Sequence, residues 1–203
     1  LAAPSANRSG SPSPSTAEHV IDDLEGRIDA VVISQKCAVG VESTVVTFAT
    51  NPPRLLRPGG ITAEMLYKYI PDLVIDSAVT AEPEKGVQVA SPGMKYKHYA
   101  PKAEVIMATG SINAFCKYCN EHKDDFDFAL CYDEDVIDLS IPHKSLGANE
   151  DHQKQAELLF DALRDIDKKS YKKVIVHAPL KEGVGLAVYN RLIRAAGFKV
   201  IEL

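Results

Sequence analysis

The stretch KVIVHAPLKEGVGLAVYNRLIRAAGFKVI, residues 173–201, alternates between two periodic patterns. The apolar run at 173–178 predicts a buried strand, and apolar residues at helical spacing over 186–196 predict a helix that ends at Gly197. Residues 200–201 predict another short strand. A strand, a helix and a second strand in this order form a right-handed crossover between parallel strands. The stretch therefore predicts a parallel β-sheet covered by helices.

The same alternation extends towards the N-terminus. Short apolar runs at 105–107 and 128–131 predict strands, and the pattern at 112–122 predicts a helix. Apolar side chains between residues 156 and 166 recur at helical spacing and predict a second helix. Residues 103–203 are therefore expected to form one α/β domain whose parallel sheet has helices on both faces.

The first part of the chain has a different composition. Proline and glycine separate short apolar runs over residues 1–75, whereas residues 76–102 contain few bulky aliphatic side chains. The second range has the composition of a linker. In the first range we expect a helix after a Ser15–Glu18 capping box, strands at 30–34 and 41–48, and a helix at 63–70 after Thr62.

The overall composition is that of an ordinary globular protein. The chain has 203 residues, of which 45% are hydrophobic and 25% are charged, and this mixture excludes a disordered or fibrous class. The formal net charge of -5 gives no general positive field for nucleic acid, so direct RNA binding is not expected. No apolar run approaches the roughly 20 residues that a membrane span needs, so no membrane partner is expected.

The cysteines indicate a reducing compartment, and we expect a cytoplasmic protein. The chain has four cysteines, but its length and ordinary core make a disulfide scaffold unnecessary. Cys116 and Cys119 form a CxxC motif, which could be a redox pair or half of a zinc site. Because the motif falls inside the predicted helix and no second ligand pair is evident, we expect two thiols packed on a helix face instead.

A loop rich in small hydroxyl and amide side chains occupies residues 3–15, Ala-Pro-Ser-Ala-Asn-Arg-Ser-Gly-Ser-Pro-Ser-Pro-Ser. Backbone N–H groups, hydroxyls and the N-terminus of the following helix can together hold a phosphate, and Gly10 permits close approach. The P-loop pattern is absent, so the alternative is an ordinary Ser-rich turn that caps the helix.

A second motif interrupts an apolar strand with polar residues. Residues 39–46, Val-Gly-Val-Glu-Ser-Thr-Val-Val, place Glu42, Ser43 and Thr44 within that strand. Unpaired buried polar groups cost about 1–3 kcal/mol each, so these side chains need partners or a ligand. They can line a pocket for a small polar ligand, or lie on the solvent side of an edge strand.

A third motif places Arg57 before Pro58 and a Gly59-Gly60 turn. An arginine fixed beside such a turn suits a bidentate contact to a phosphate or a carboxylate. The alternative is a surface arginine that precedes a turn.

A fourth motif, Ser-Pro-Gly-Met-Lys-Tyr-Lys-His-Tyr-Ala-Pro at residues 91–101, lies inside the predicted linker. In an extended conformation Lys95, Lys97 and Tyr99 share one side. This pattern fits a strap over an anionic ligand, or an aromatic-anchored spacer.

In this order the four motifs are far more specific than any one of them, and they resemble those of the YrdC family, in its long two-domain form of threonylcarbamoyl-AMP synthase. The resemblance covers residues 1–102 and, more weakly, the Gly-Val-Gly-Leu-Ala turn at 183–187. It implies the C-terminal part of a YrdC-like α/β domain at 1–75, a linker at 76–102 and a Rossmann-like parallel-sheet domain at 103–203.

The resemblance also implies an activity. Enzymes of this family are nucleotidyltransferases that combine L-threonine, bicarbonate and ATP, with Mg²⁺, into threonylcarbamoyl-AMP and pyrophosphate. The product serves a tRNA modification that downstream threonylcarbamoyl-transfer proteins complete. By motif match, Ser5 and Asn7 are the catalytic Ser-x-Asn pair. The other implied roles are ATP contacts from Ser5, Ser13, Arg57 and Tyr99, threonine contacts from Ala3 and Ser43, a linker contact from His98, and no protein ligand for the metal.

One departure and one alternative accompany this resemblance. The family's Lys-x-Arg motif, which precedes the Ser-Ala-Asn segment, is absent, so we expect no product from these 203 residues alone. The alternative is a binding or regulatory module without catalysis, with the Gly183-Val184-Gly185 turn as a ligand site at a helix N-terminus. The acidic runs at 124–125 and 133–135 are expected to be solvated loops, and the histidines at 19, 122, 143, 152 and 177 to be surface or structural residues.

Overall fold

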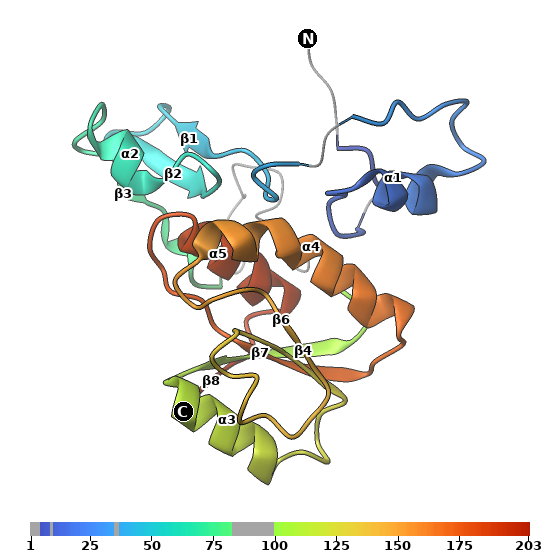
Figure 1. The fold of residues 1–203 in the computed structure, drawn as a ribbon. Helices are drawn as coiled ribbons and strands as arrows, with labels where there is room; N and C mark the ends of the chain where they lie inside the picture. The colour runs from blue at the N-terminus through green and yellow to red at the C-terminus, as the bar shows by residue number, and fades with distance from the viewer. Residues whose placement is uncertain (1–4, 9, 35–36, 83–99) are drawn as a thin grey trace.

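Two β-sheets, one from each half of the chain, organise the protein (Figure 1). The computed structural model describes residues 5–8, 10–34, 37–82 and 100–203. The first half contributes a three-stranded sheet, and the second half contributes a five-stranded sheet. The predicted α/β class is confirmed, whereas the predicted boundaries of the linker, at residues 76 and 102, stay predictions.

The five-stranded sheet is parallel throughout. Its order is β6-β5-β7-β4-β8, and each neighbouring pair of strands is parallel. All the strands predicted for this half are confirmed, but the sequence does not predict β6, because His-Lys-Ser lacks the β-branched and aromatic residues that favour strands. The bounds are Glu104–Thr109 for β4, Phe128–Cys131 for β5, His143–Ser145 for β6, Lys173–His177 for β7 and Val200–Glu202 for β8.

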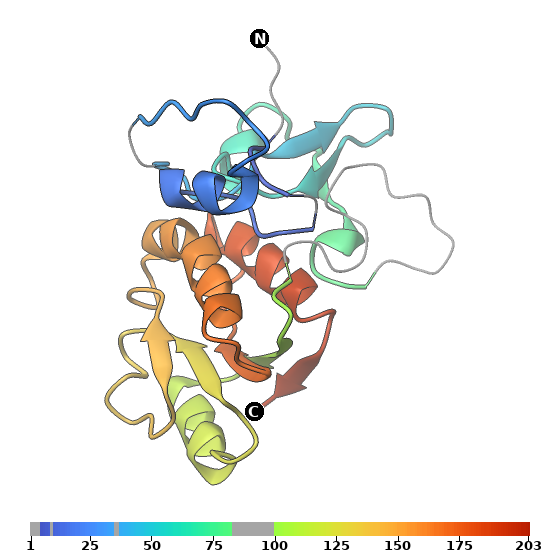
Figure 2. The same cartoon turned by 90° about the vertical axis from the view of Figure 1, so that its right-hand side faces the viewer.

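Helices cover both faces of this sheet (Figure 1 and Figure 2). On one face lies α3, Ile112–Glu121, with Phe115 fully buried beneath it. On the other face lie α4, His152–Lys168, and α5, Gly185–Ala195, with Leu163 fully buried. Full burial of each large apolar side chain contributes about 1.5–3 kcal/mol, so the two layers of side chains stabilise this domain.

The Cys116 and Cys119 thiols lie on the buried side of α3. Both are free, and burial raises the pKa of Cys116 to about 11 and the pKa of Cys119 to about 12. Thiols with such pKa values stay protonated at neutral pH, whereas a redox pair needs an accessible thiolate. The prediction of two thiols packed on a helix face is therefore confirmed.

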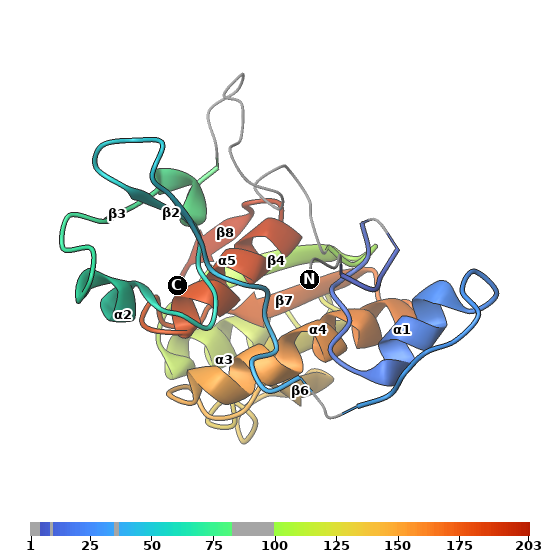
Figure 3. The same cartoon turned by 90° about the horizontal axis from the view of Figure 1, so that it is seen from above.

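The first half of the chain lies over α4 and α5, on the side away from the five-stranded sheet (Figure 1 and Figure 3). In its own sheet β1 is antiparallel to β2, and β2 is parallel to β3. The bounds are Ala17–Leu24 for α1, Val45–Thr47 for β1, Arg54–Arg57 for β2, Ala63–Tyr67 for α2, Val74–Ile75 for β3 and Ser77–Val79 for the 3₁₀ helix η1.

The helix termini in this half differ from the predictions by small amounts. Thr16, rather than Ser15, caps α1, because the Thr16 hydroxyl accepts from the backbone N–H of His19. Thr62 caps α2 as predicted. The helix expected over 63–70 ends earlier, at Tyr67, where the chain begins a turn.

The two strand predictions in this half are wrong, one in its length and the other altogether. The strand expected at 41–48 shortens to β1. No strand forms at 30–34, where Val32 is 93% exposed. A strand is stable only with hydrogen-bonded neighbours, and no segment that the structure describes pairs with these residues. The apolar, β-branched composition alone is therefore insufficient here.

Candidate functional site

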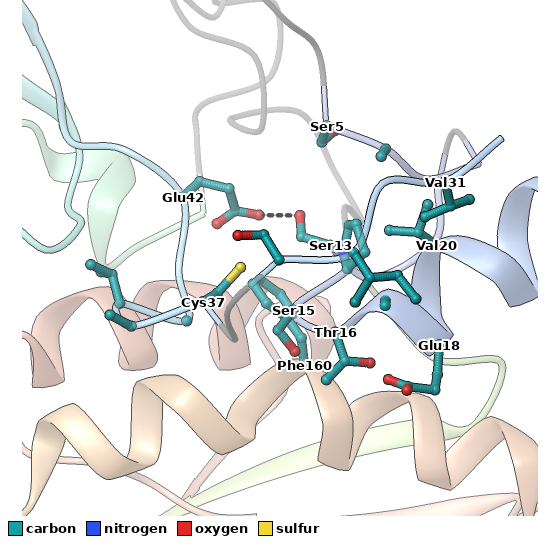
Figure 4. A pocket seen from close by; sticks show the side chains of 18 of the residues that line it. Ser5, Ser13, Ser15, Thr16, Glu18, Val20, Val31, Cys37, Glu42 and Phe160 are labelled. Atoms are coloured by element: carbon teal, nitrogen blue, oxygen red, sulfur yellow. Dashed lines mark hydrogen bonds between the residues drawn. The ribbon is translucent and has the colours of Figure 1, made fainter.

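A cavity of about 970 Å³ lies between the first motif, α1 and the segment that leads to β1 (Figure 4). Small-molecule sites typically enclose about 300–1,000 Å³, so the cavity can hold a nucleotide-sized ligand. Apolar side chains from residues 31–33 and 37–41 form one wall. The polar side of the cavity includes Ser5, Ser13, Ser15, Glu18 and Glu42.

Ser13 and Glu42 join the first and second motifs at this cavity (Figure 4). The Ser13 hydroxyl donates to Oε1 of Glu42 at 2.5 Å, although 29 residues separate the two in the sequence. Oε2 of the same carboxylate accepts from Nε of Arg191 at 2.7 Å. Burial favours a higher pKa for Glu42, but the Arg191 charge and these hydrogen bonds outweigh it and hold the pKa below its usual value. Glu42 is therefore ionised at neutral pH and fixes the Ser13 hydroxyl.

The second and third motifs meet along the β1–β2 pair. Val45 lies opposite Arg57 in the antiparallel register, and Nε of Arg57 donates to the carbonyl oxygen of Ser43 at 2.9 Å. Gly59 packs against the same segment, where a Cβ would lie 2.6 Å from the backbone nitrogen of Thr44. Only glycine fits at that distance, so the Arg-Pro-Gly-Gly sequence allows the two backbones to touch.

The predicted catalytic pair lies on the first motif. Ser5 is exposed and lines the same cavity as Ser13. The Asn7 amide donates to the carbonyl oxygens of Arg8 and Ser11 at 3.0 and 3.1 Å. These contacts of Asn7 stay within its own loop, so the described structure brings Ser5, but not Asn7, to the cavity.

The remaining predicted residues fall into two groups. Ser43 is exposed and follows Glu42, which lines the cavity, and Arg57 is half-buried and contacts Ser43. Neither Ser43 nor Arg57 lines the cavity itself. Ala3, His98 and Tyr99 lie outside the described residues. The roles assigned to all of these residues stay predictions.

A buried arginine of α4, which the sequence pattern does not single out, holds the first motif. The Arg164 guanidinium donates to both carboxylate oxygens of Asp23, at 3.1 and 2.7 Å, and to the carbonyl oxygen of Pro12 at 2.5 Å. Hydrogen bonds from Arg164, with its positive charge and the Arg8 backbone N–H, hold the pKa of Asp23 below its usual value against the effect of burial. This ion pair fastens α1 and the motif before it to the sheet domain.

The sequence pattern also does not indicate a second group of buried polar residues, which lies on α5. Arg191 and Arg194 are each 1% exposed. Arg194 donates to the carbonyl oxygen of Ala78 at 2.6 Å, and the Asn190 amide donates to that of Val79 at 2.6 Å. Two arginines three residues apart share one helix face, a pattern that normally indicates solvent exposure. Here the first half of the chain covers that face, which a local pattern cannot reveal.

Asp135 and His177 form a buried pair at the carboxyl ends of β5 and β7. Oδ2 of Asp135 lies 2.8 Å from Nδ1 of His177 and accepts from the backbone N–H of Tyr132 at 2.8 Å. Nε2 of His177 lies 3.3 Å from the carbonyl oxygen of Gly110. Asp135 is fully buried, so the prediction of a solvated loop at 133–135 is wrong for this residue. The Tyr132 N–H and the His177 ring satisfy the buried Asp135 side chain. The predicted structural role of His177 is confirmed.

The glycine turn at the start of α5 faces a carboxylate of the chain itself. The Gly183 backbone N–H points to Oε1 of Glu64 at 3.4 Å. The adjoining cavity of about 810 Å³ is lined by further acidic side chains, among them Glu150, Asp151 and Glu182. Lys68 and His152 line the same cavity, and the ligand site expected at this helix N-terminus stays a prediction.

Neither a membrane span nor a cluster of metal-ligating side chains is found among the described residues. No helix among them combines the length and apolar character of a membrane span. No three histidine, cysteine, aspartate or glutamate side chains in the described ranges are grouped as a metal site.

Comparison with known proteins identifies the family to which this fold belongs. A family model described as "Threonylcarbamoyl-AMP synthase, C-terminal domain" matches residues 61–197, and a model described as "Telomere recombination" matches residues 1–59. The fold and the site define an α/β protein in which a Rossmann-like sheet domain adjoins a YrdC-like segment. The chain belongs to the YrdC/Sua5 family of threonylcarbamoyl-AMP synthases.

Curated relatives from three organisms are named threonylcarbamoyl-AMP synthase. The Bacillus subtilis (strain 168) protein is 40% identical over 211 residues, which cover 100% of this chain and 58% of the relative. The Pyrococcus abyssi (strain GE5 / Orsay) protein is 38% identical, with 100% and 59% covered, and the Schizosaccharomyces pombe protein is 36% identical, with 97% and 52% covered. The chain therefore spans a little over half the length of these relatives.

A solved structure has the same fold. The crystal structure of P. abyssi Sua5 complexed with L-threonine superposes with a TM-score of 0.82 at 35% identity, and the match covers 98% of this chain and 58% of that one. The arrangement of the two halves described above is thus shared with a member of the family.

Proposed function

We propose that these residues are part of a cytoplasmic threonylcarbamoyl-AMP synthase, a nucleotidyltransferase that uses L-threonine, bicarbonate and ATP. The threonine amine combines with bicarbonate, losing water, to form a carbamate. A carbamate oxygen attacks the α-phosphorus of ATP, the bond from that phosphorus to the bridging oxygen breaks, and pyrophosphate leaves. The product, threonylcarbamoyl-AMP, is used by downstream proteins that transfer the threonylcarbamoyl group to tRNA.

One structural observation supports this proposal above the others. The Ser13–Glu42 and Arg57–Ser43 contacts join three separate motifs beside a single cavity of about 970 Å³. Membership of the family suggests which reaction occurs there. The P. abyssi neighbour, whose crystals hold L-threonine, supports threonine as a substrate.

The chemistry of the residues suits adenylation without a protein nucleophile. Hydroxyl and amide donors and one guanidinium can orient the triphosphate and stabilise the charge that develops on it. In our assignment Ser5 and Asn7 act in catalysis, Ser5, Ser13, Arg57 and Tyr99 contact ATP, Ala3 and Ser43 contact threonine, and His98 supports the linker.

In the proposed reaction Mg²⁺ enters with ATP. The described residues hold no group of three metal-ligating side chains, and Glu42, the carboxylate beside Ser13, is already paired with Arg191. Mg²⁺ usually keeps several waters and binds substrate phosphates rather than an all-protein cage. We therefore assign the ion to the phosphate oxygens of the nucleotide.

The test is pyrophosphate release by the full-length protein. Release should require threonine, bicarbonate and ATP together, and omission of any one should abolish it. Pyrophosphate release that does not depend on threonine overturns the proposal. A folded full-length protein that releases no pyrophosphate overturns it as well. The 203 residues expressed alone should release no pyrophosphate, because they lack the family's Lys-x-Arg motif.

A further inference from the structure

The loop that we assign to ATP is attached to the sheet domain at two consecutive residues. Nη2 of Arg164, on α4, donates to the carbonyl oxygen of Pro12 at 2.5 Å. Arg191, on α5, reaches Ser13 through the Glu42 carboxylate, with 2.7 Å from Nε to Oε2 and 2.5 Å from the Ser13 hydroxyl to Oε1. The two arginines thus fix the backbone of one residue and the side chain of the next.

Both arginines are withdrawn from solvent. Arg164 is 8% exposed and Arg191 is 1% exposed. Each guanidinium is paired with a carboxylate, Asp23 for Arg164 and Glu42 for Arg191. Buried ion pairs add little net stability compared with well-packed apolar residues, but they hold groups in a defined geometry. The two pairs therefore fix the position of the loop relative to α4 and α5.

We propose that Arg164 and Arg191 are positioning residues of the ATP site, which hold Pro12 and Ser13 so that the loop keeps the shape in which it contacts the nucleotide. This inference rests on the proposed function and adds to it a role for the C-terminal sheet domain. Neither arginine is among the residues that line the cavity, so both act through the groups that they hold.

The test compares Arg164→Met and Arg191→Met with the wild type, each as the full-length protein in steady-state turnover. A displaced loop binds ATP less well, so the KM for ATP should rise about tenfold in each variant, the size expected for a lost charge-assisted hydrogen bond. The kcat at saturating ATP should change less than about threefold. A merely structural defect has another signature, because a smaller folded fraction lowers kcat and leaves the KM for ATP unchanged.

Lys168→Met is the matched control. Lys168 of α4 pairs with Asp22 of α1 across the same interface, with Nζ 2.9 Å from Oδ2, but its side chain is 58% exposed and it contacts neither Pro12 nor Ser13. Its KM for ATP should equal that of the wild type. Arg191→Lys, which keeps a positive charge near Glu42, should recover part of the affinity that Arg191→Met loses.

Each outcome decides the inference. If Arg191→Met does not fold, Glu42→Gln replaces it, because the glutamine keeps the shape of the side chain and removes the ion pair, and the same rise in the KM for ATP is expected. A wild-type protein that is active, with an unchanged KM for ATP in these variants, overturns the inference and leaves the proposed function intact. A wild-type protein without threonine-dependent turnover overturns the proposed function, and the inference with it.

Discussion

Nε of Arg57 donates to the carbonyl oxygen of Ser43 at 2.9 Å, so the residue that we assign to ATP directly supports the residue that we assign to threonine. The contact uses the backbone of Ser43 and not its hydroxyl. Removal of the Ser43 hydroxyl and removal of the Arg57 side chain should therefore change the affinities for threonine and ATP differently.

Ser43→Ala removes one neutral hydroxyl and keeps the carbonyl that Arg57 contacts. A typical hydrogen bond contributes about 0.5–1.5 kcal/mol, so the KM for threonine should rise by about two- to tenfold while the KM for ATP stays within about twofold. Steady-state turnover with each substrate varied in turn measures both constants. An effect on ATP as large as that on threonine contradicts the assignment of Ser43.

Arg57→Ala removes the guanidinium and, with it, the support of the Ser43 backbone. The affinities for ATP and for threonine should both fall, by about tenfold or more for the charged contact to the nucleotide. Equilibrium titration of each ligand tests this. If neither affinity changes, Arg57 lies outside the site.

The two glycines after Pro58 should respond differently to alanine. A Cβ at Gly59 would lie 2.6 and 2.9 Å from backbone atoms of Thr44 and Ser43. A Cβ at Gly60 would instead meet the side chain of Val39, which is 42% exposed and able to move. Gly59→Ala should lower the free energy of unfolding by about 1–3 kcal/mol, and Gly60→Ala by less than about 1 kcal/mol. Urea titrations of both variants measure the difference, and equal losses would show that the backbone contact is unimportant.

The Asp23–Arg164 pair should make stability depend on pH in the acid range. The hydrogen bonds and charge of Arg164 lower the pKa of Asp23 in the folded state. The ionised Asp23 side chain therefore contributes fully to the free energy of unfolding above its unfolded pKa of about 3.9, and this contribution is lost as the pH falls through the folded pKa. Asp23→Asn leaves the Arg164 charge buried without its partner and should lower the free energy of unfolding by about 3–5 kcal/mol at pH 7.

The gap in unfolding free energy between wild type and Asp23→Asn should therefore narrow below about pH 4. Urea titrations at several pH values between neutral and acid measure the gap. A gap that is constant down to the lowest pH would mean that Asp23 does not titrate with folding.

One thiol should react in the folded protein. Cys37 is exposed, whereas Cys116, Cys119 and Cys131 are buried, and burial raises the pKa of each of these three. Alkylation at neutral pH followed by mass spectrometry should find label on Cys37 in native buffer and on all four cysteines in denaturant. Rapid labelling of Cys116 in native buffer would show that α3 is not packed as described.

The five-stranded sheet could be predicted because its signals are local. Residues 128–131, for example, are all buried in β5, as an uninterrupted apolar run predicts for a strand inside a parallel sheet. Residues 30–34 have a similar composition, yet they form no strand in the described structure. Residues 128–131 have neighbouring strands with which to pair, whereas residues 30–34 have none in the described structure. A run of five residues does not show whether such neighbours exist.

The candidate site was predictable in part for a different reason. The order of the motifs indicates that Ser13, Ser43 and Arg57 belong to one site, and the contacts of Glu42 and Ser43 bring their segments together. The roles of Arg164 and Arg191 could not be predicted, because their partners Asp23 and Glu42 lie 141 and 149 residues away. Buried arginines on a helix cannot be told from solvated ones until the covering segment is known.

These long sequence separations also bear on the order in which the protein assembles. Every strand of the five-stranded sheet pairs within residues 104–202, so the backbone pairing of that sheet is complete without the first half of the chain. Pro12 contacts a residue 152 positions further along, and closing so large a loop has an entropic cost that only a formed partner surface offsets. We therefore expect the C-terminal domain to fold first, and the serine-rich loop to acquire its shape only when it docks onto the finished α4 and α5.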